Sequence, residues 1–142
     1  MDNKKLVGII SAVIGAVLFT LSLVFYILSF GSEDYAEYGA EFWADSDYLV
    51  FMIIGISYSV YGIITVLKEG TEGFNFVKAT TFTLVFTGFI DVAYCFGKFF
   101  KAIAKGNGFD AWHFNFGLAG LLLLGLGILV YYMNKKKEIT TK

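Results

Sequence analysis

Proline and arginine are absent from this 142-residue chain, and cysteine and histidine occur once each. Without proline, no helix is kinked or broken by that residue, so we expect straight helices. Without arginine, the chain has no guanidinium group for bidentate phosphate contacts, which argues against nucleic acid as a partner. The single cysteine, Cys95, excludes an internal disulfide and a multi-thiolate metal centre. Its apolar neighbours in the sequence predict an inert, packed thiol.

Long apolar stretches are what the chain has in abundance, and 57% of its residues are hydrophobic. A hydrocarbon core of about 30 Å is crossed by about 20 mostly apolar residues in a helix. Four stretches reach about that length, at residues 6–30, 48–67, 79–97 and 111–134. The sequence therefore predicts an all-α integral membrane protein: a four-transmembrane-helix bundle that forms a single domain over residues 1–142.

The lysines are distributed unevenly between the two predicted sides of the membrane. Three of them, Lys98, Lys101 and Lys105, follow the third stretch, and the other eight fall on the opposite side. Because positive charge accumulates in cytoplasmic loops, we expect both termini to be cytoplasmic. The predicted location is a plasma or cytoplasmic membrane, which the chain crosses four times.

Asp91 is a carboxylate in the outer half of the third apolar stretch. Placing it in hydrocarbon costs at least about 2.5 kcal/mol, so it must be sheltered. Counting from residue 79, it lies about 18 Å from the inner boundary. Steps of three and four along the sequence place it on one helical face, which should line the bundle interior or an outward-facing cavity. The members of this face are Thr80, Leu84, Thr87, Asp91, Tyr94, Lys98, Lys101 and Lys105.

Two interpretations of this polar face stay open. In the first, it is the wall of a transport pathway for cations or protons, and its candidate residues are Thr87, Asp91, Tyr94, Lys98, His113 and Asn115. In the second, Asp91 is structural: it accepts a hydrogen bond and fixes the register of the helices. The donors considered for that bond are Tyr94, Thr87, Ser57, Tyr58 and Tyr61.

His113 and Asn115 stand at the outer start of the fourth stretch. An imidazole paired with Asp91 would suit proton transfer. The alternative is an interfacial histidine beside Trp112. Because no nucleophile accompanies these groups, we expect no catalytic residue and no enzyme.

The first outer connection is strongly acidic and contains no lysine. The spacing of its acids and aromatic residues predicts a short amphipathic helix on the membrane surface. The acids are interaction candidates, and the pattern of a calcium loop is missing, so we expect neither a metal nor a cofactor. These acids are Glu33, Asp34, Glu37, Glu41, Asp45 and Asp47.

Glycines within the predicted spans allow two helices to approach closely. They serve either packing inside the bundle or association with a second copy. Those considered are Gly55, Gly62, Gly117, Gly120, Gly125 and Gly127.

The number of spans is similar to that of the small multidrug-resistance transporters, but residues 6–30 lack the carboxylate of their first span. We therefore assign no family. The sequence favours a non-enzymatic accessory or interaction subunit of a larger membrane assembly, in contact with lipid and with either a membrane protein or a second copy. The alternative is a small oligomeric transporter or channel for protons or cations that uses Asp91.

Overall fold

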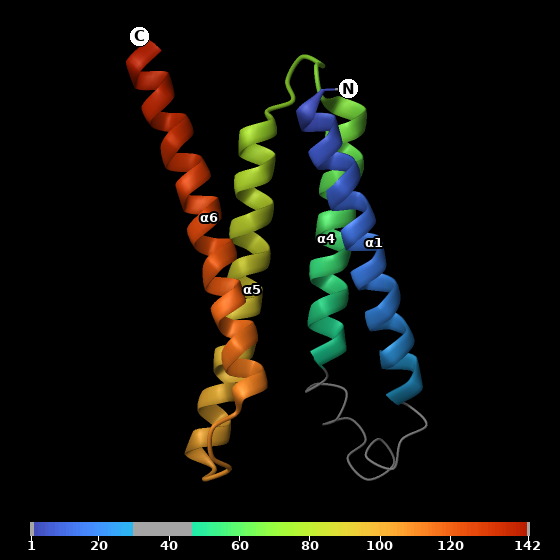
Figure 1. Ribbon diagram of the computed structural model, residues 1–142, viewed down its shortest axis with the longest axis vertical. Coiled ribbons are helices and arrows are strands. Elements are labelled where there is room, and N and C mark those ends of the chain that lie inside the picture. The colour runs from blue at the N-terminus through green and yellow to red at the C-terminus, as the bar shows by residue number, and fades with distance from the viewer. Residues whose placement is uncertain (1, 30–46, 142) are drawn as a thin grey trace. The chain divides into compact units, whose positions relative to one another are not determined.

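The computed structural model describes residues 2–29 and 47–141, and its helices are α1 (Asn3–Ser29), α4 (Asp47–Lys68), α5 (Phe76–Ala104) and α6 (Ala111–Thr141) (Figure 1). All four are long and apolar enough to cross a membrane. This confirms the prediction of an all-α chain with four helices of spanning length and composition, and it indicates a multi-pass membrane protein. The short acidic helix predicted in the first outer connection falls outside the described residues.

α5 and α6 are longer than the apolar stretches that predicted them. α5 begins before residue 79 and ends after residue 97, and α6 continues past residue 134 to Thr141. Asn75 starts α5, because its side chain accepts a hydrogen bond from the backbone N–H of Lys78 at 3.0 Å. Gly106, with a φ of 75°, follows the other end of α5, where a left-handed residue stops a helix. Hydropathy marks the lipid-exposed part of a helix, whereas these caps mark its real ends.

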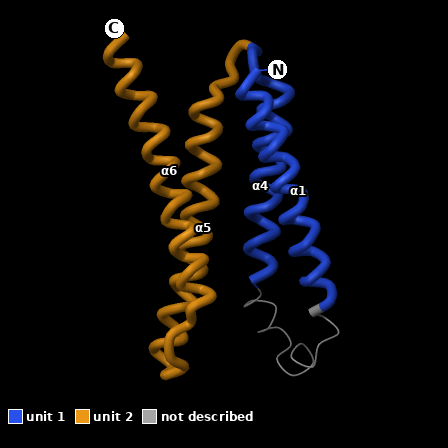
Figure 2. Tube along the Cα trace, viewed as in Figure 1, with its two compact units in different colours: residues 1–71 blue, residues 72–142 orange. Residues whose placement is uncertain are grey.

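The chain divides into two compact units, residues 1–71 and 72–142 (Figure 2). Each unit is a hairpin of two antiparallel helices, α1 with α4 and α5 with α6 (Figure 1). The prediction that all four spans form one domain stays a prediction.

In the first unit, glycine backbones bring α1 and α4 together. A Cβ atom on Gly8 would lie 2.9 Å from the carbonyl oxygen of Gly62, and one on Gly55 would lie 2.9 Å from that of Gly15. Residues this close leave no room for a side chain, so the two backbones are in direct contact. At one end of the hairpin, Lys4 and Glu69 form an ion pair of 3.2 Å.

In the second unit, glycines of both helices hold α5 and α6 close together. A Cβ atom on Gly88 would lie 2.7 Å from the backbone nitrogen of Leu124, and one on Gly127 would lie 2.8 Å from Val85. Gly117 lies against the ring of Phe96. Glycine packing within a hairpin is therefore confirmed for five of the six predicted glycines. Gly125 is the exception, because no atom of the described residues lies within 4 Å of the position its Cβ would take.

Candidate functional site

Asp91 lies on the face of α5 that packs against α6, and only 4% of its surface is exposed. Its Oδ1 atom accepts a hydrogen bond of 3.2 Å from the thiol of Cys95, one helical turn further along. Cys95 is itself 2% exposed. The carboxylate and the thiol thus form a buried polar pair inside the hairpin.

Gly120 of α6 faces this pair. A Cβ atom on Gly120 would lie 2.9 Å from Asp91 Oδ2 and 2.9 Å from the backbone nitrogen of Val92. A carboxylate in hydrocarbon is costly, and enclosure by a neighbouring helix reduces its exposure to lipid. The missing side chain at position 120 is what makes room for the carboxylate. The expectation that Asp91 is sheltered is confirmed.

Thr87, one turn before Asp91, is completely buried. Its hydroxyl donates to the carbonyl oxygen of Thr83 at 2.7 Å, and the Thr83 hydroxyl donates to that of Ala79 at 2.9 Å. Thr80 repeats the pattern with Phe76 at 2.8 Å. Hydroxyls that bond back along their own helix can be buried without a partner from another helix. The predicted polar face is therefore largely satisfied within α5.

Tyr94 and Lys98 continue this face toward the connection between α5 and α6. The ammonium of Lys98 lies 5.7 Å from the centre of the Tyr94 ring, within the range of a cation–π contact. The ring of Tyr94 also meets the ring of His113 edge-on, with 6.3 Å between the ring centres. These three predicted residues are thus brought together at one end of the hairpin.

His113 pairs with Asp110, the residue just before α6. Its Nδ1 atom is bonded to Asp110 Oδ2, and its backbone N–H donates to Asp110 Oδ1 at 3.2 Å. Asp110 therefore caps the helix, and the hydrogen bond from His113 lowers the pKa of its carboxyl group below the ordinary value of 3.8.

The geometry of α6 does not favour the expected pairing of His113 with Asp91. Gly120 is the residue of α6 that faces Asp91, and it lies two turns, or about 10 Å, along the helix from His113. Asn115 is exposed. The proposed roles of His113 and Asn115 in a proton or cation pathway stay predictions.

The acidic interaction candidates lie mostly outside the described residues. Glu33, Asp34, Glu37, Glu41 and Asp45 fall there, and Asp47 stands in the first turn of α4. A carboxylate in that turn interacts favourably with the positive end of the helix dipole. Among residues 2–29 and 47–141, no three His, Cys, Asp or Glu side chains gather in a way that could hold a metal ion.

The sequence interpretation missed Cys95 and Gly120 as neighbours of Asp91. It predicted a packed thiol in apolar surroundings. The packing is confirmed, because Cys95 is 2% exposed, but the surroundings are not purely apolar, because the thiol donates to a carboxylate. The spacing of four residues between Asp91 and Cys95 was the available signal, since residues four apart share a helical face. No comparable signal in the sequence pairs Gly120 with Asp91.

Comparisons of the chain with models of known families, with curated proteins and with solved structures found no match.

Proposed function

We propose that this protein is a non-enzymatic accessory subunit of a larger membrane assembly, with both termini on the cytoplasmic side of a plasma or cytoplasmic membrane. The observation that carries the proposal is that the Asp91 carboxylate is enclosed within its own hairpin. The carboxylate that would form a transport or reaction centre accepts a hydrogen bond from Cys95 of its own helix and is enclosed by Gly120 of α6. Its fit against Gly120 sets the register between α5 and α6, which is a structural role.

The outward faces of both hairpins support an interaction role. Large apolar side chains are exposed along all four helices; Leu67, Phe82 and Leu122, for example, are each about 70% exposed. Within a bilayer, such faces contact either lipid or another transmembrane helix. The acidic first outer connection adds a charged surface through which a basic partner can be selected.

The proposed orientation of the chain in the membrane rests on the positions of its lysines. Lys68 and Lys78 flank the connection between α4 and α5, and Lys135 to Lys137 lie in the last turns of α6. This arrangement favours cytoplasmic termini by the positive-inside rule. The proposed orientation is tested with a reporter that is active on only one side of the membrane. The reporter is fused in turn to each terminus and to residue 107.

The accessory role is tested by crosslinking in cells followed by identification of the copurified membrane protein. In the test variant, Glu37→Gln is combined with Glu41→Gln. Amides preserve the shape of the side chains and add no positive charge that would alter topology. The matched control combines Glu72→Gln with Glu138→Gln, which removes the same charge from two exposed positions. We expect the outer-loop variant to lose a defined partner that the control and Asp91→Asn retain. Equal retention by all variants would contradict recognition through the acidic connection.

A second candidate is a small transporter for protons or cations, and one feature of Asp91 favours it. Its hydrogen-bond donor is a thiol, which is a weak donor, whereas a carboxylate has about four acceptor sites. The remaining acceptor capacity suits a proton or a cation. The test is proton- and cation-driven flux in proteoliposomes. Flux that disappears in folded Asp91→Asn would favour transport, and no flux above that of empty liposomes would favour the accessory role.

A further inference from the structure

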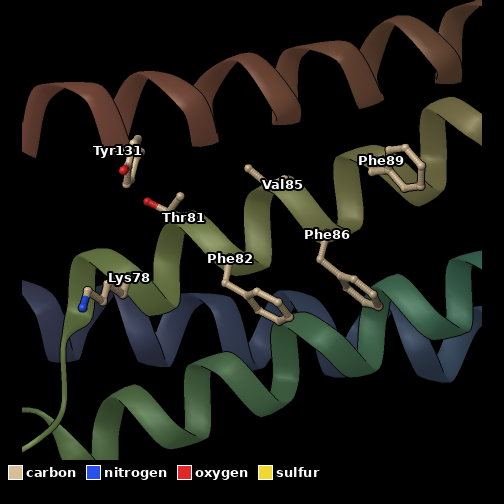
Figure 3. A pocket seen from close by; sticks show the side chains of 7 residues that line it. All are labelled: Lys78, Thr81, Phe82, Val85, Phe86, Phe89 and Tyr131. Carbon is tan, nitrogen blue, oxygen red and sulfur yellow. The ribbon is translucent and has the colours of Figure 1, made fainter. Parts of the chain in front are cut away.

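A groove of about 610 Å³ runs along α5 in the second unit (Figure 3). Its walls change in character along the helix. Lys78 and Thr81 lie near one end, Tyr131 of α6 lies across from Thr81, and three phenylalanines and a valine follow further along. The lining residues are Lys78, Thr81, Phe82, Val85, Phe86, Phe89 and Tyr131.

The groove has the length of one membrane leaflet. From Lys78 to Phe89 the helix rises by about 16 Å, and half of a hydrocarbon core is about 15 Å. Lys78 stands in the first turn of α5, at the same end of the hairpin as the final turns of α6. The groove therefore extends from the membrane surface, where Lys78 lies, to about the middle of the bilayer.

The groove is open on one side, and almost all of its lining is apolar. An extended hydrocarbon chain needs no hydrogen bonds from such walls. The apolar lining therefore suits an acyl chain, and the charge at one end decides between lipid and other apolar occupants.

The charged end of the groove selects the headgroup. Lys78 is exposed, and the structure of residues 2–29 and 47–141 gives it no ion pair. Lys135, Lys136 and Lys137 lie one to two turns beyond Tyr131 on α6, with Glu138 as the acid beside them. This end of the hairpin is therefore positive and complements an anionic headgroup.

We propose that the groove binds an anionic glycerophospholipid of the lysine-rich leaflet. The phosphate lies at the ammonium of Lys78. One acyl chain lies along Phe82, Val85, Phe86 and Phe89. The binding site is independent of the role of Asp91, which lies on a different face of α5.

Native mass spectrometry of the full chain in micelles tests headgroup selection. The probes are phosphatidylglycerol and phosphatidylcholine with identical acyl chains. One lysine near a membrane surface corresponds to about a fivefold change in binding of an anionic lipid. We expect Lys78→Ala to weaken phosphatidylglycerol binding about fivefold and Lys78→Arg to retain it. Lys105→Ala, which removes the same charge at the other end of α5, should bind like the wild type.

Two results would overturn headgroup selection. One is equal binding of the two lipids by the wild type. The other is equal weakening by Lys78→Ala and Lys105→Ala. Helical content and elution volume of each variant, compared with the wild type, exclude loss of fold as the cause.

The acyl chain is located with a phosphatidylglycerol that carries a photoactivatable diazirine in its chain. We expect adducts within residues 78–89 and at Tyr131, and we expect excess unlabelled phosphatidylglycerol to remove them more effectively than phosphatidylcholine. Adducts spread evenly over the exposed apolar residues of α5 and α6 would show ordinary surrounding lipid and refute a specific site.

Discussion

Replacing Gly120 with alanine tests whether α5 and α6 are held together at Asp91. The added methyl group would lie 2.9 Å from Asp91 Oδ2 and 2.9 Å from the backbone nitrogen of Val92. Real Cβ atoms do not tolerate such distances, so a helix or the carboxylate must move. Gly125 offers a matched control in the same helix, because nothing in the described residues lies within 4 Å of its added methyl group.

The expected change in the free energy of unfolding follows from two opposing effects. Alanine is favoured over glycine within a helix by about 1 kcal/mol, and this gain applies to both positions. Overpacking costs about 1 to 3 kcal/mol and applies to position 120 alone. Gly125→Ala should therefore raise the free energy of unfolding by about 1 kcal/mol. Gly120→Ala should lie about 1 to 3 kcal/mol below Gly125→Ala, and this difference isolates the contact.

The measurement is reversible unfolding in mixed micelles as the fraction of denaturing detergent is raised. Both variants are followed by the same spectroscopic signal and compared with the wild type. If Gly120→Ala stabilises the protein as much as Gly125→Ala, the close contact between α6 and Asp91 is refuted.

Three further results are expected. Asp91→Asn should unfold at the same or a higher detergent fraction than the wild type, because a neutral amide is cheaper to bury than a carboxylate and can still accept from Cys95. A loss above about 3 kcal/mol would show instead that the carboxylate has a charged partner that the amide cannot replace. Cys95 is 2% exposed, so it should react slowly with a maleimide in the folded protein and rapidly after unfolding. The control protein, Thr71→Cys with Cys95→Ser, should react rapidly in the folded and in the unfolded state, because Thr71 is exposed. Fast labelling of Cys95 in the folded protein would show an open hairpin. Because the pKa of Asp110 is lowered in the folded state, its contribution to stability is present above its ordinary pKa and is lost as the pH falls through the folded value. Asp110→Asn should therefore weaken the acid dependence of unfolding below the ordinary pKa of an aspartate, and an unchanged profile would argue against the Asp110–His113 pair.

Part of the candidate site followed from the sequence alone. The hydropathy of the third span identified Asp91 as a charge that needs shelter, and the spacing of Thr87, Asp91 and Tyr94 placed them on one helical face. The donor to Asp91 was not predicted, since a thiol in an apolar stretch is indistinguishable by composition from a packed cysteine. The partner of His113 was missed although the predicted start of the fourth span at residue 111 left Asp110 in the N-cap position, three residues before His113.

The sequence by itself determined the class of protein and the number of spans. Burial of apolar residues in lipid depends on composition and length, which can be counted without knowing any contact. The tertiary structure decided which glycines pack. Gly120 and Gly125 are five residues apart in one apolar helix, yet the first meets Asp91 and the second meets nothing described. Helix packing depends on the rotation and depth of two helices relative to each other, and neither is a property of one segment read alone.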